Sequence, residues 1–154
     1  MKSFETTITK QDIQKVTELL ESGDIGFGSN VKVFEDRFSE YSTKKYNIGL
    51  NSASAGAYCL FSYLYDKHGS CDVYTPSLGF TSISWAAKKN GHRIIFVDVD
   101  DNLLFDFNSY EKQKENTTRK KVLLPVLYGG VSNIPNFNKQ VTDEIVVVDS
   151  AHCI

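Results

Sequence analysis

Apolar and polar residues follow two alternating patterns along the chain. Short, mostly apolar runs, typical of strands, alternate with stretches in which apolar residues recur every three or four positions, typical of amphipathic helices. The short runs predict five strands, at residues 46–50, 71–75, 93–97, 122–127 and 144–149. Strands and helices at this βαβ spacing form parallel sheets. We therefore expect an α/β fold with a mainly parallel sheet and helices on both faces.

Two helices are predicted before the first strand. Thr9 and Asp12 resemble a capping box, with Asp in place of the usual Glu, and would begin the first helix. A loop at residues 26–30 follows, in which Ser29 or Asn30 could cap the second helix. The loop lacks the third glycine of a G-x-G-x-x-G motif and has no strand immediately before it. These two differences exclude a dinucleotide-binding loop.

Two polar residues that could bind a ligand follow the apolar run of the last predicted strand. Residues 145–148 are Ile-Val-Val-Val, typical of a parallel strand buried on both faces, and Asp149 and His152 follow at the carboxyl end. Ligands of open α/β sheets bind at this edge. A carboxylate buried there needs a cation beside it, and the protonated ring nitrogen of a cofactor would serve. In the alternative interpretation, Asp149 only caps a following helix.

Residues 51–57 have mostly small side chains and lead from the first predicted strand into a helix. Their sequence is Asn-Ser-Ala-Ser-Ala-Gly-Ala. A strand, a turn and a helix start with such small side chains leave backbone N–H groups open to an anion. A tightly packed helix start without a ligand would have the same sequence, so the segment alone leaves phosphate binding open.

Composition excludes several classes of partner and compartment. The chain has 17 Lys and Arg against 19 Asp and Glu, a net charge of -2, which argues against a nucleic-acid partner. A long apolar run and a signal-peptide pattern are both absent, so we expect a cytoplasmic protein that is not in a membrane. The cysteines at positions 59, 71 and 153 have no C-x-x-C spacing, which favours free thiols over a disulfide framework or a zinc site. We expect no bound metal.

Five segments, taken in order, resemble the DegT/StrS-type nucleotide-sugar aminotransferases. These are pyridoxal 5′-phosphate (PLP) enzymes of the aspartate-aminotransferase fold, also called fold type I. The likeness extends from about Gly26 to the last residue. The matching segments are residues 51–56, 76–82, 95–100, 125–130 and 148–152.

The resemblance implies a role for five residues at the cofactor. Ala53 and Ser54 would bind the PLP phosphate through backbone N–H groups and a hydroxyl. Phe80 would stack on the pyridine ring, where the family has an aromatic residue. Asp149 would pair with the protonated pyridine nitrogen and keep the ring an electron sink. His152 matches the position that reaches the phenolic oxygen of the ring.

Other positions concern the surroundings of the cofactor. Leu127 stands where the family usually has histidine, which would alter packing or polarity near the cofactor. Gly130 is expected to form a backbone turn beneath the site. The Schiff-base lysine of the family lies downstream of Asp149. Lys139 cannot replace it, because it precedes the last strand in a polar helix predicted at residues 134–140. We therefore expect no catalytic residue within residues 1–154.

Domain organisation follows from the same resemblance. A strand like 145–148 needs cover on both faces, and only residues 149–154 follow it. We expect residues 1–154 to be the N-terminal portion of the large PLP-binding domain, without the lysine segment and the C-terminal small domain. Pro125, in the fourth predicted strand, would favour a sheet edge or a bulge.

The function implied for the complete protein is amino transfer to a nucleotide-linked keto sugar. The donor would be an amino acid, in the first place glutamate, and the enzyme would be a homodimer with sites at the subunit interface. Within the same family, a PLP-dependent sugar dehydratase, with histidine in place of the lysine, is the alternative. From a different class, the chain could be a non-catalytic truncated remnant.

Overall fold

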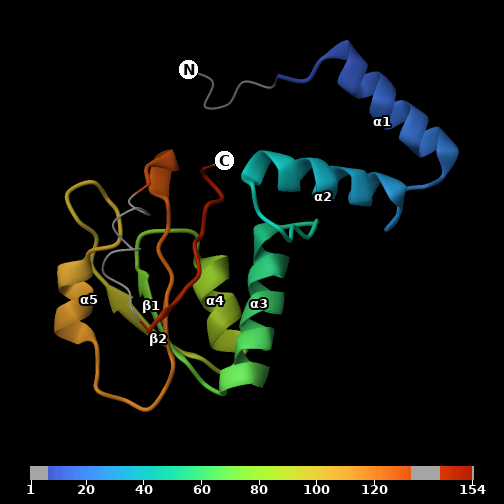
Figure 1. Cartoon of the computed structure of the whole chain (residues 1–154). Coiled ribbons are helices and arrows are strands. Elements are labelled where there is room, and N and C mark those ends of the chain that lie inside the picture. Colours follow the sequence, from blue (N-terminus) through green and yellow to red (C-terminus); the bar gives the residue numbers. More distant parts are fainter. Residues whose placement is uncertain (1–6, 133–142, 154) are drawn as a thin grey trace. The chain divides into compact units, whose positions relative to one another are not determined.

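The computed structural model describes residues 7–132 and 143–153 (Figure 1). The chain divides into two compact units, Met1–Gly49 and Leu50–Ile154, which are considered one at a time. The helix predicted at residues 134–140, including Lys139, lies outside the described residues.

The first unit begins with helix α1, Lys10–Ser22. Thr9 is its N-cap, and the predicted capping box is confirmed: the Thr9 side chain accepts from the Asp12 N–H, and the Asp12 carboxylate accepts from the Thr9 N–H at 2.8 Å. The apolar residues that share one face of α1 are more than half exposed: Ile13 58%, Val16 57% and Leu20 63%. No described residue of α1 is buried, so the amphipathic pattern here does not mark a packed face.

Helix α2, Ser29–Ser42, differs from the prediction at its first residue. Gly28 is the N-cap, whereas Ser29 or Asn30 was the expected cap. Gly28 has extended backbone angles, φ -135° and ψ -164°, and its carbonyl accepts from the N–H groups of Val31 and Lys32. The helix therefore already includes Ser29, and no side chain caps its start.

The strand predicted at residues 46–50 is not formed. A strand exists only when its N–H and C=O groups pair with a neighbour, and no described strand pairs with this segment. Side chains of α2 supply hydrogen bonds instead. The Gly49 N–H donates to Glu35 Oε1 at 2.8 Å, and the side-chain Nδ2 of Asn47 donates to Ser39 Oγ at 2.7 Å.

The second unit holds a four-stranded parallel sheet in the order β2-β1-β3-β4. Its elements, in chain order, are α3 (Ala53–His68), β1 (Asp72–Pro76), α4 (Thr81–Lys89), β2 (Arg93–Val97), α5 (Phe107–Gln113), β3 (Lys121–Leu123), the short 3-10 helix η1 (Tyr128–Gly130) and β4 (Ile145–Val146). The strands predicted at 71–75 and 93–97 are confirmed to within one residue.

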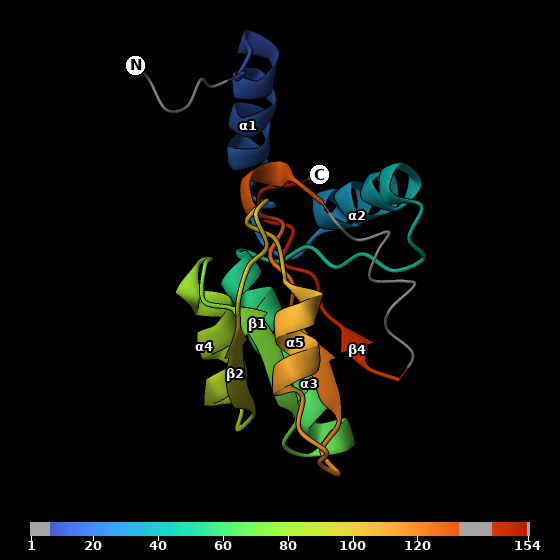
Figure 2. The same ribbon diagram turned by 90° about the vertical axis from the view of Figure 1, so that its left-hand side faces the viewer.

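Helices cover both faces of this sheet (Figures 1 and 2). On one face, Val73 and Val122 pack in a core with Phe61 of α3 and Ala87 of α4. The opposite face has a second core with α5, and its members are Tyr74, Val97, Phe105, Tyr110 and Leu123. Alternate residues of β1 thus enter different cores, and every residue of the strand is buried. The α/β fold with a mainly parallel sheet is confirmed.

Pro125 interrupts the pairing of β3 with β4. The Val147 N–H donates to the Leu123 carbonyl and the Asp149 N–H to the Pro125 carbonyl, both at 2.9 Å. Pro125 has no N–H to donate in return, so the regular ladder ends at Leu123 and resumes only as a bridge between Val126 and Asp149. Of the expected edge or bulge, the edge is wrong, because β3 lies inside the sheet. The bulge stays a prediction.

The last strand is also shorter and more exposed than predicted. β4 covers only Ile145–Val146 rather than residues 144–149. Ile145 and Val147 pack against the α3–α4 core, whereas Val146 and Val148 are 38% and 36% exposed. Among the described residues, the strand is therefore covered on one face, and the prediction of burial on both faces is not met.

An ionic network around the buried carboxylate of Asp72 lies at the amino edge of the sheet. Asp72, the first residue of β1, is 0% exposed. The Arg93 guanidinium binds both of its carboxylate oxygens, at 2.8 and 2.9 Å, and the Thr117 hydroxyl donates to one of them at 3.0 Å. Arg119 approaches at 3.5 Å, and Glu115 binds the outer side of Arg93. This network joins the first residues of β1 and β2 to the segment before β3.

Candidate functional site

The crevice expected to bind a ligand lies between β1 and β3. From β1 the chain crosses through α4 to β2 on one side, and then through α5 to β3 on the other. At such a switch point the loops after neighbouring strands diverge, and ligands of open α/β sheets bind there at the carboxyl edge. The loop after β1 holds Phe80, and the segment after β3 holds η1.

Two serines meet at this edge. α3 ends just before β1 begins, and α4 begins just after β1 ends, so the first turns of both helices lie at the carboxyl edge. The Ser54 and Ser82 hydroxyls are hydrogen-bonded at 2.8 Å. Ser52 caps α3 by accepting from the Ala55 N–H at 3.2 Å. Ala53 is the first residue of this helix, and first-turn N–H groups have no partner within a helix.

Phe80 is the N-cap residue of α4, and the residue is 75% exposed. Gly79 before it lies against Val126: a Cβ at position 79 would lie 3.2 Å from Val126 Cγ2. Val126 is in turn the bridge partner of Asp149. Val126 therefore contacts the loop that holds Phe80 and also pairs with Asp149. Phe80 remains exposed and accessible to a ligand.

Asp149 is held by its backbone on both sides. Its N–H donates to the Pro125 carbonyl and its carbonyl accepts from the Leu127 N–H, both at 2.9 Å. Its Oδ1 accepts from the Ala151 N–H at 3.1 Å, which forms a turn directly after the strand. This contact closes a turn, and no helix follows Asp149 among the described residues, so the helix-capping alternative is not met. Asp149 itself is partly buried at the carboxyl edge.

His152 lies against η1 rather than pointing freely from the edge. Its Nδ1 accepts from the Gly129 N–H at 3.3 Å, and its ring centroid is 5.8 Å from that of Tyr128. Gly130 has φ +81°, so the expected turn is present, and a Cβ there would lie 3.0 Å from the His152 carbonyl oxygen. Leu127 is 5% exposed. Its side chain therefore belongs to the interior of the unit.

Replacing Gly130 tests this turn. In Gly130→Ala, the left-handed backbone and the contact with the His152 carbonyl should lower the free energy of unfolding by about 1–2 kcal/mol. Gly129→Ala provides the matched control. It has φ +65° but nothing within 4 Å of its added Cβ, so it should cost less. Chemical denaturation measures both, and equal costs would contradict the role of the close contact.

The described residues fit PLP in chemistry but do not enclose it. Hydroxyl and N–H donors suit a phosphate, the exposed ring of Phe80 suits stacking, and the Asp149 carboxylate suits a pyridinium nitrogen. The recess beneath Phe80 measures about 60 Å³, far below the roughly 300–1,000 Å³ of typical ligand pockets. No lysine lines this recess among the described residues.

Ser82 is the site residue that sequence reasoning did not identify. It lies within the family-like segment 76–82, but nothing in the spacing shows that it meets Ser54 from 28 residues away. Tyr128, whose ring lies beside that of His152, was likewise not singled out. Both pairings depend on tertiary packing, which residue patterns do not report.

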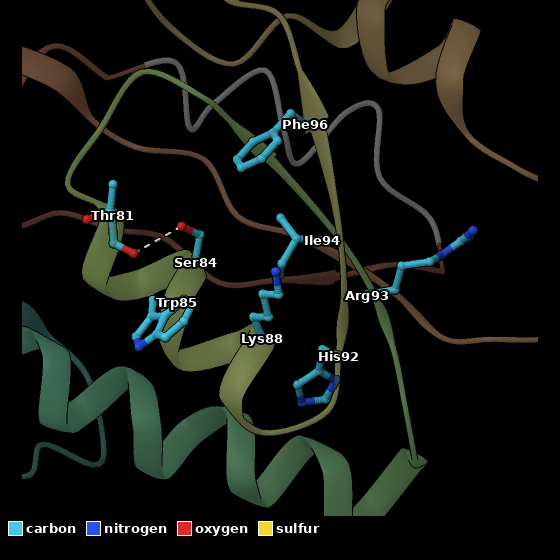
Figure 3. Close-up of a pocket in the computed structure, with 8 residues that line it drawn as sticks. All are labelled: Thr81, Ser84, Trp85, Lys88, His92, Arg93, Ile94 and Phe96. Carbon is cyan, nitrogen blue, oxygen red and sulfur yellow. Dashed lines mark hydrogen bonds between the residues drawn. The ribbon is translucent and has the colours of Figure 1, made fainter.

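A larger cavity, of about 560 Å³, lies between α4 and β2 (Figure 3). Trp85, Ile94 and Phe96 form apolar walls, and Lys88 extends along it. Arg93, which also lines this cavity, forms ion pairs with Asp72 and Glu115. Over residues 7–132 and 143–153, no group of three or more His, Cys, Asp or Glu is arranged for a metal, and no helix is long and apolar enough to cross a membrane.

Comparison with known proteins supports the fold and identifies the family. The chain is 33% identical over 126 residues to the UDP-4-amino-4-deoxy-L-arabinose–oxoglutarate aminotransferase of Shewanella sediminis (strain HAW-EB3), a match that covers 81% of this chain and 32% of that protein. Among solved structures, GDP-4-keto-6-deoxymannose-3-dehydratase with a trapped PLP-glutamate geminal diamine has a TM-score of 0.86 at 22% identity, covering 97% of this chain and 41% of that one. Helicobacter pylori PseC, an aminotransferase involved in the biosynthesis of pseudoaminic acid, has a TM-score of 0.84 at 21% identity, with the same coverage.

This chain thus spans about a third to two fifths of the proteins it resembles. The structural neighbours share its fold, the one expected for PLP-dependent aminotransferases. The sequence model of one family matches residues 6–154, nearly the whole length, and PLP is the cofactor of that family. The chain therefore belongs to the DegT/DnrJ/EryC1/StrS aminotransferase family.

Proposed function

We propose that residues 1–154 are the N-terminal portion of the large domain of a PLP-dependent aminotransferase. The complete protein would transfer the amino group of glutamate to a nucleotide-linked keto sugar. The observation that supports this proposal is that the helix start with Ser54, the loop with Phe80 and the strand end with Asp149 lie at the same carboxyl edge of the sheet. The relative that acts on a UDP-linked amino sugar with oxoglutarate supports the substrate class.

Each residue would do one thing to the cofactor. Ser54 and the N–H groups at Ala53 would bind its phosphate. Phe80 would fix the plane of the ring, and His152 would lie near the phenolic oxygen. Asp149 would hold a proton on the pyridine nitrogen, and the ring so protonated supplies the electron sink for amino transfer. The Schiff-base lysine would come from a segment outside residues 1–154, so residues 1–154 alone would not catalyse amino transfer.

A sugar dehydratase is the second candidate. The neighbour with a TM-score of 0.86 is a GDP-4-keto-6-deoxymannose-3-dehydratase. The phosphate, ring and nitrogen contacts would serve both reactions. The residue at the lysine position, lysine or histidine, would decide between them.

The complete enzyme would be a cytoplasmic homodimer. The exposed apolar side chains of the first unit support association, since large apolar patches mark contact surfaces, and Phe34 of α2 is 58% exposed. Sedimentation of the complete protein should give a dimer. A monomer at micromolar concentration would contradict a shared site.

The direct test mixes the complete protein with PLP and glutamate, and then with a nucleotide-linked keto sugar. Release of 2-oxoglutarate and appearance of an amino sugar are expected, because both halves of amino transfer would then be present. Loss of water from the sugar without amination would favour the dehydratase. No reaction with either substrate would favour a non-catalytic protein.

Phe80→Ala should weaken PLP binding about two- to tenfold, since an aromatic stacking contact contributes roughly 0.5–1.5 kcal/mol. Stability should change little, because the residue is 75% exposed. The cofactor absorbance during titration measures the dissociation constant. Phe80→Tyr keeps an aromatic face and should restore binding, whereas equal weakening by both variants would exclude stacking.

A further inference from the structure

Ser82 is joined to the proposed phosphate site by one short hydrogen bond. Its Oγ lies 2.8 Å from Ser54 Oγ, and both residues are half-buried. Ser54 is the second residue of α3, and Ser82 is the second residue of α4. The bond therefore links the first turns of two different helices.

Core packing fixes this pair in place. Directly below the serines, Ala57 and Phe61 of α3 share a core with Ile83, Ala86 and Ala87 of α4. The small alanine side chains allow the two helices to approach closely. The position of Ser82 relative to Ser54 is thus determined by buried apolar contacts and not by the solvent-exposed loops.

A bound phosphate would determine which of the two serine hydroxyls donates its proton to the other. An ionised phosphate offers only acceptor oxygens, so Ser54 can bind it only by donating its proton. In the structure Ser54 Oγ donates to Ser82 Oγ. When Ser54 donates to a phosphate instead, its oxygen becomes available as an acceptor, and Ser82 is the hydroxyl within reach to donate to it. A chain of donors from Ser82 through Ser54 to the phosphate strengthens each bond, since hydrogen bonds in series polarise one another.

We propose that Ser82 is a positioning residue for the cofactor phosphate: it donates to Ser54 and orients the Ser54 hydroxyl toward the phosphate. This inference rests on the proposed function, because it assigns a phosphate to Ser54. The proposed PLP site assigns the phosphate to Ser54 and Ala53 only, and this inference adds the Ser82 hydroxyl on α4.

The test compares PLP with pyridoxal, which lacks the phosphate, in the complete protein. Ser82→Ala should raise the dissociation constant of PLP about five- to tenfold, the size of one lost hydrogen bond, and leave that of pyridoxal unchanged. In a Ser54→Ala background, the same change should have no further effect. Ser82→Thr retains a hydroxyl and should restore PLP binding.

Ser22→Ala is the matched control, a serine of α1 whose hydroxyl donates to the backbone carbonyl of Leu19 at 2.7 Å. It should leave both dissociation constants unchanged. Equal weakening of PLP and pyridoxal by Ser82→Ala would show a merely structural role and overturn the proposal, as would an undiminished effect in the Ser54→Ala background. If the unmodified protein binds PLP no better than pyridoxal, the phosphate site itself fails, an outcome distinct from the other two.

Discussion

Asp149→Asn in the complete protein should lower the rate of amino transfer from glutamate on the order of a hundredfold. With PLP bound, Asp149 and the pyridinium nitrogen would form a buried ion pair, and removing one partner of such a pair costs about 3 kcal/mol. A neutral amide cannot hold a proton on the pyridine nitrogen, and the ring then loses its capacity as an electron sink. Single-turnover release of 2-oxoglutarate measures this rate.

The fold should survive this substitution. Among the described residues, Asp149 Oδ1 accepts a hydrogen bond from the Ala151 N–H, and the side-chain oxygen of an asparagine can accept the same bond. Asp143→Asn, at the other end of the β4 segment and bound to Lys120 on the surface, is the matched control and should keep full activity. Full activity of Asp149→Asn would refute the proposed nitrogen partner.

Asp72→Asn should lower the free energy of unfolding by roughly 2–3 kcal/mol at pH 7. The carboxylate is fully buried and binds Arg93 through both oxygens, and hydrogen bonds to charged groups contribute about 1.5–3 kcal/mol. The loss should stay below the roughly 3–5 kcal/mol of a fully buried broken pair, because Arg93 is 37% exposed and keeps Glu115. Denaturant unfolding of the two proteins measures the difference.

The cost of Asp72→Asn should shrink in acid. Burial alone would raise the pKa of Asp72, but hydrogen bonds from Arg93 and Thr117 outweigh it and hold the pKa below its ordinary value. A lowered pKa means that the stabilisation is present above the unfolded value of about 3.9 and is lost as the pH falls through the lower folded value.

The control for this pair is Asp36→Asn, since Asp36 binds Lys32 on the surface of α2. Such exposed pairs contribute about 0–1 kcal/mol, so the change should be small. A cost of Asp72→Asn that stays constant from pH 7 to pH 2 would contradict the ionic account of the network.

Local signals allowed much of this fold to be predicted. The capping box at Thr9 and the apolar runs of β1 and β2 depend on nearby residues, and both expectations were confirmed. The segment 46–50 has the same apolar character but is not a strand, because strand formation also needs a paired neighbour. Pro125 shows a related limit. Its missing N–H was evident from the sequence, but the position of its strand inside the sheet was not.

The candidate site divides in the same way. Ser54, Phe80 and Asp149 follow predicted helix starts and strand ends, and the parallel topology brings their segments to one edge. The bond from Ser54 to Ser82 and the contact of His152 with Tyr128 depend on how helices and loops pack, and the residue pattern carried no sign of them.

The most direct test of the central claim is a crystal structure of the complete protein with bound PLP. We expect the phosphate within hydrogen-bond distance, about 2.7–3.2 Å, of Ser54, the ring against Phe80, and the ring nitrogen at a similar distance from the Asp149 carboxylate. PLP bound elsewhere, for example in the cavity between α4 and β2, or with its ring nitrogen remote from Asp149, would contradict the account.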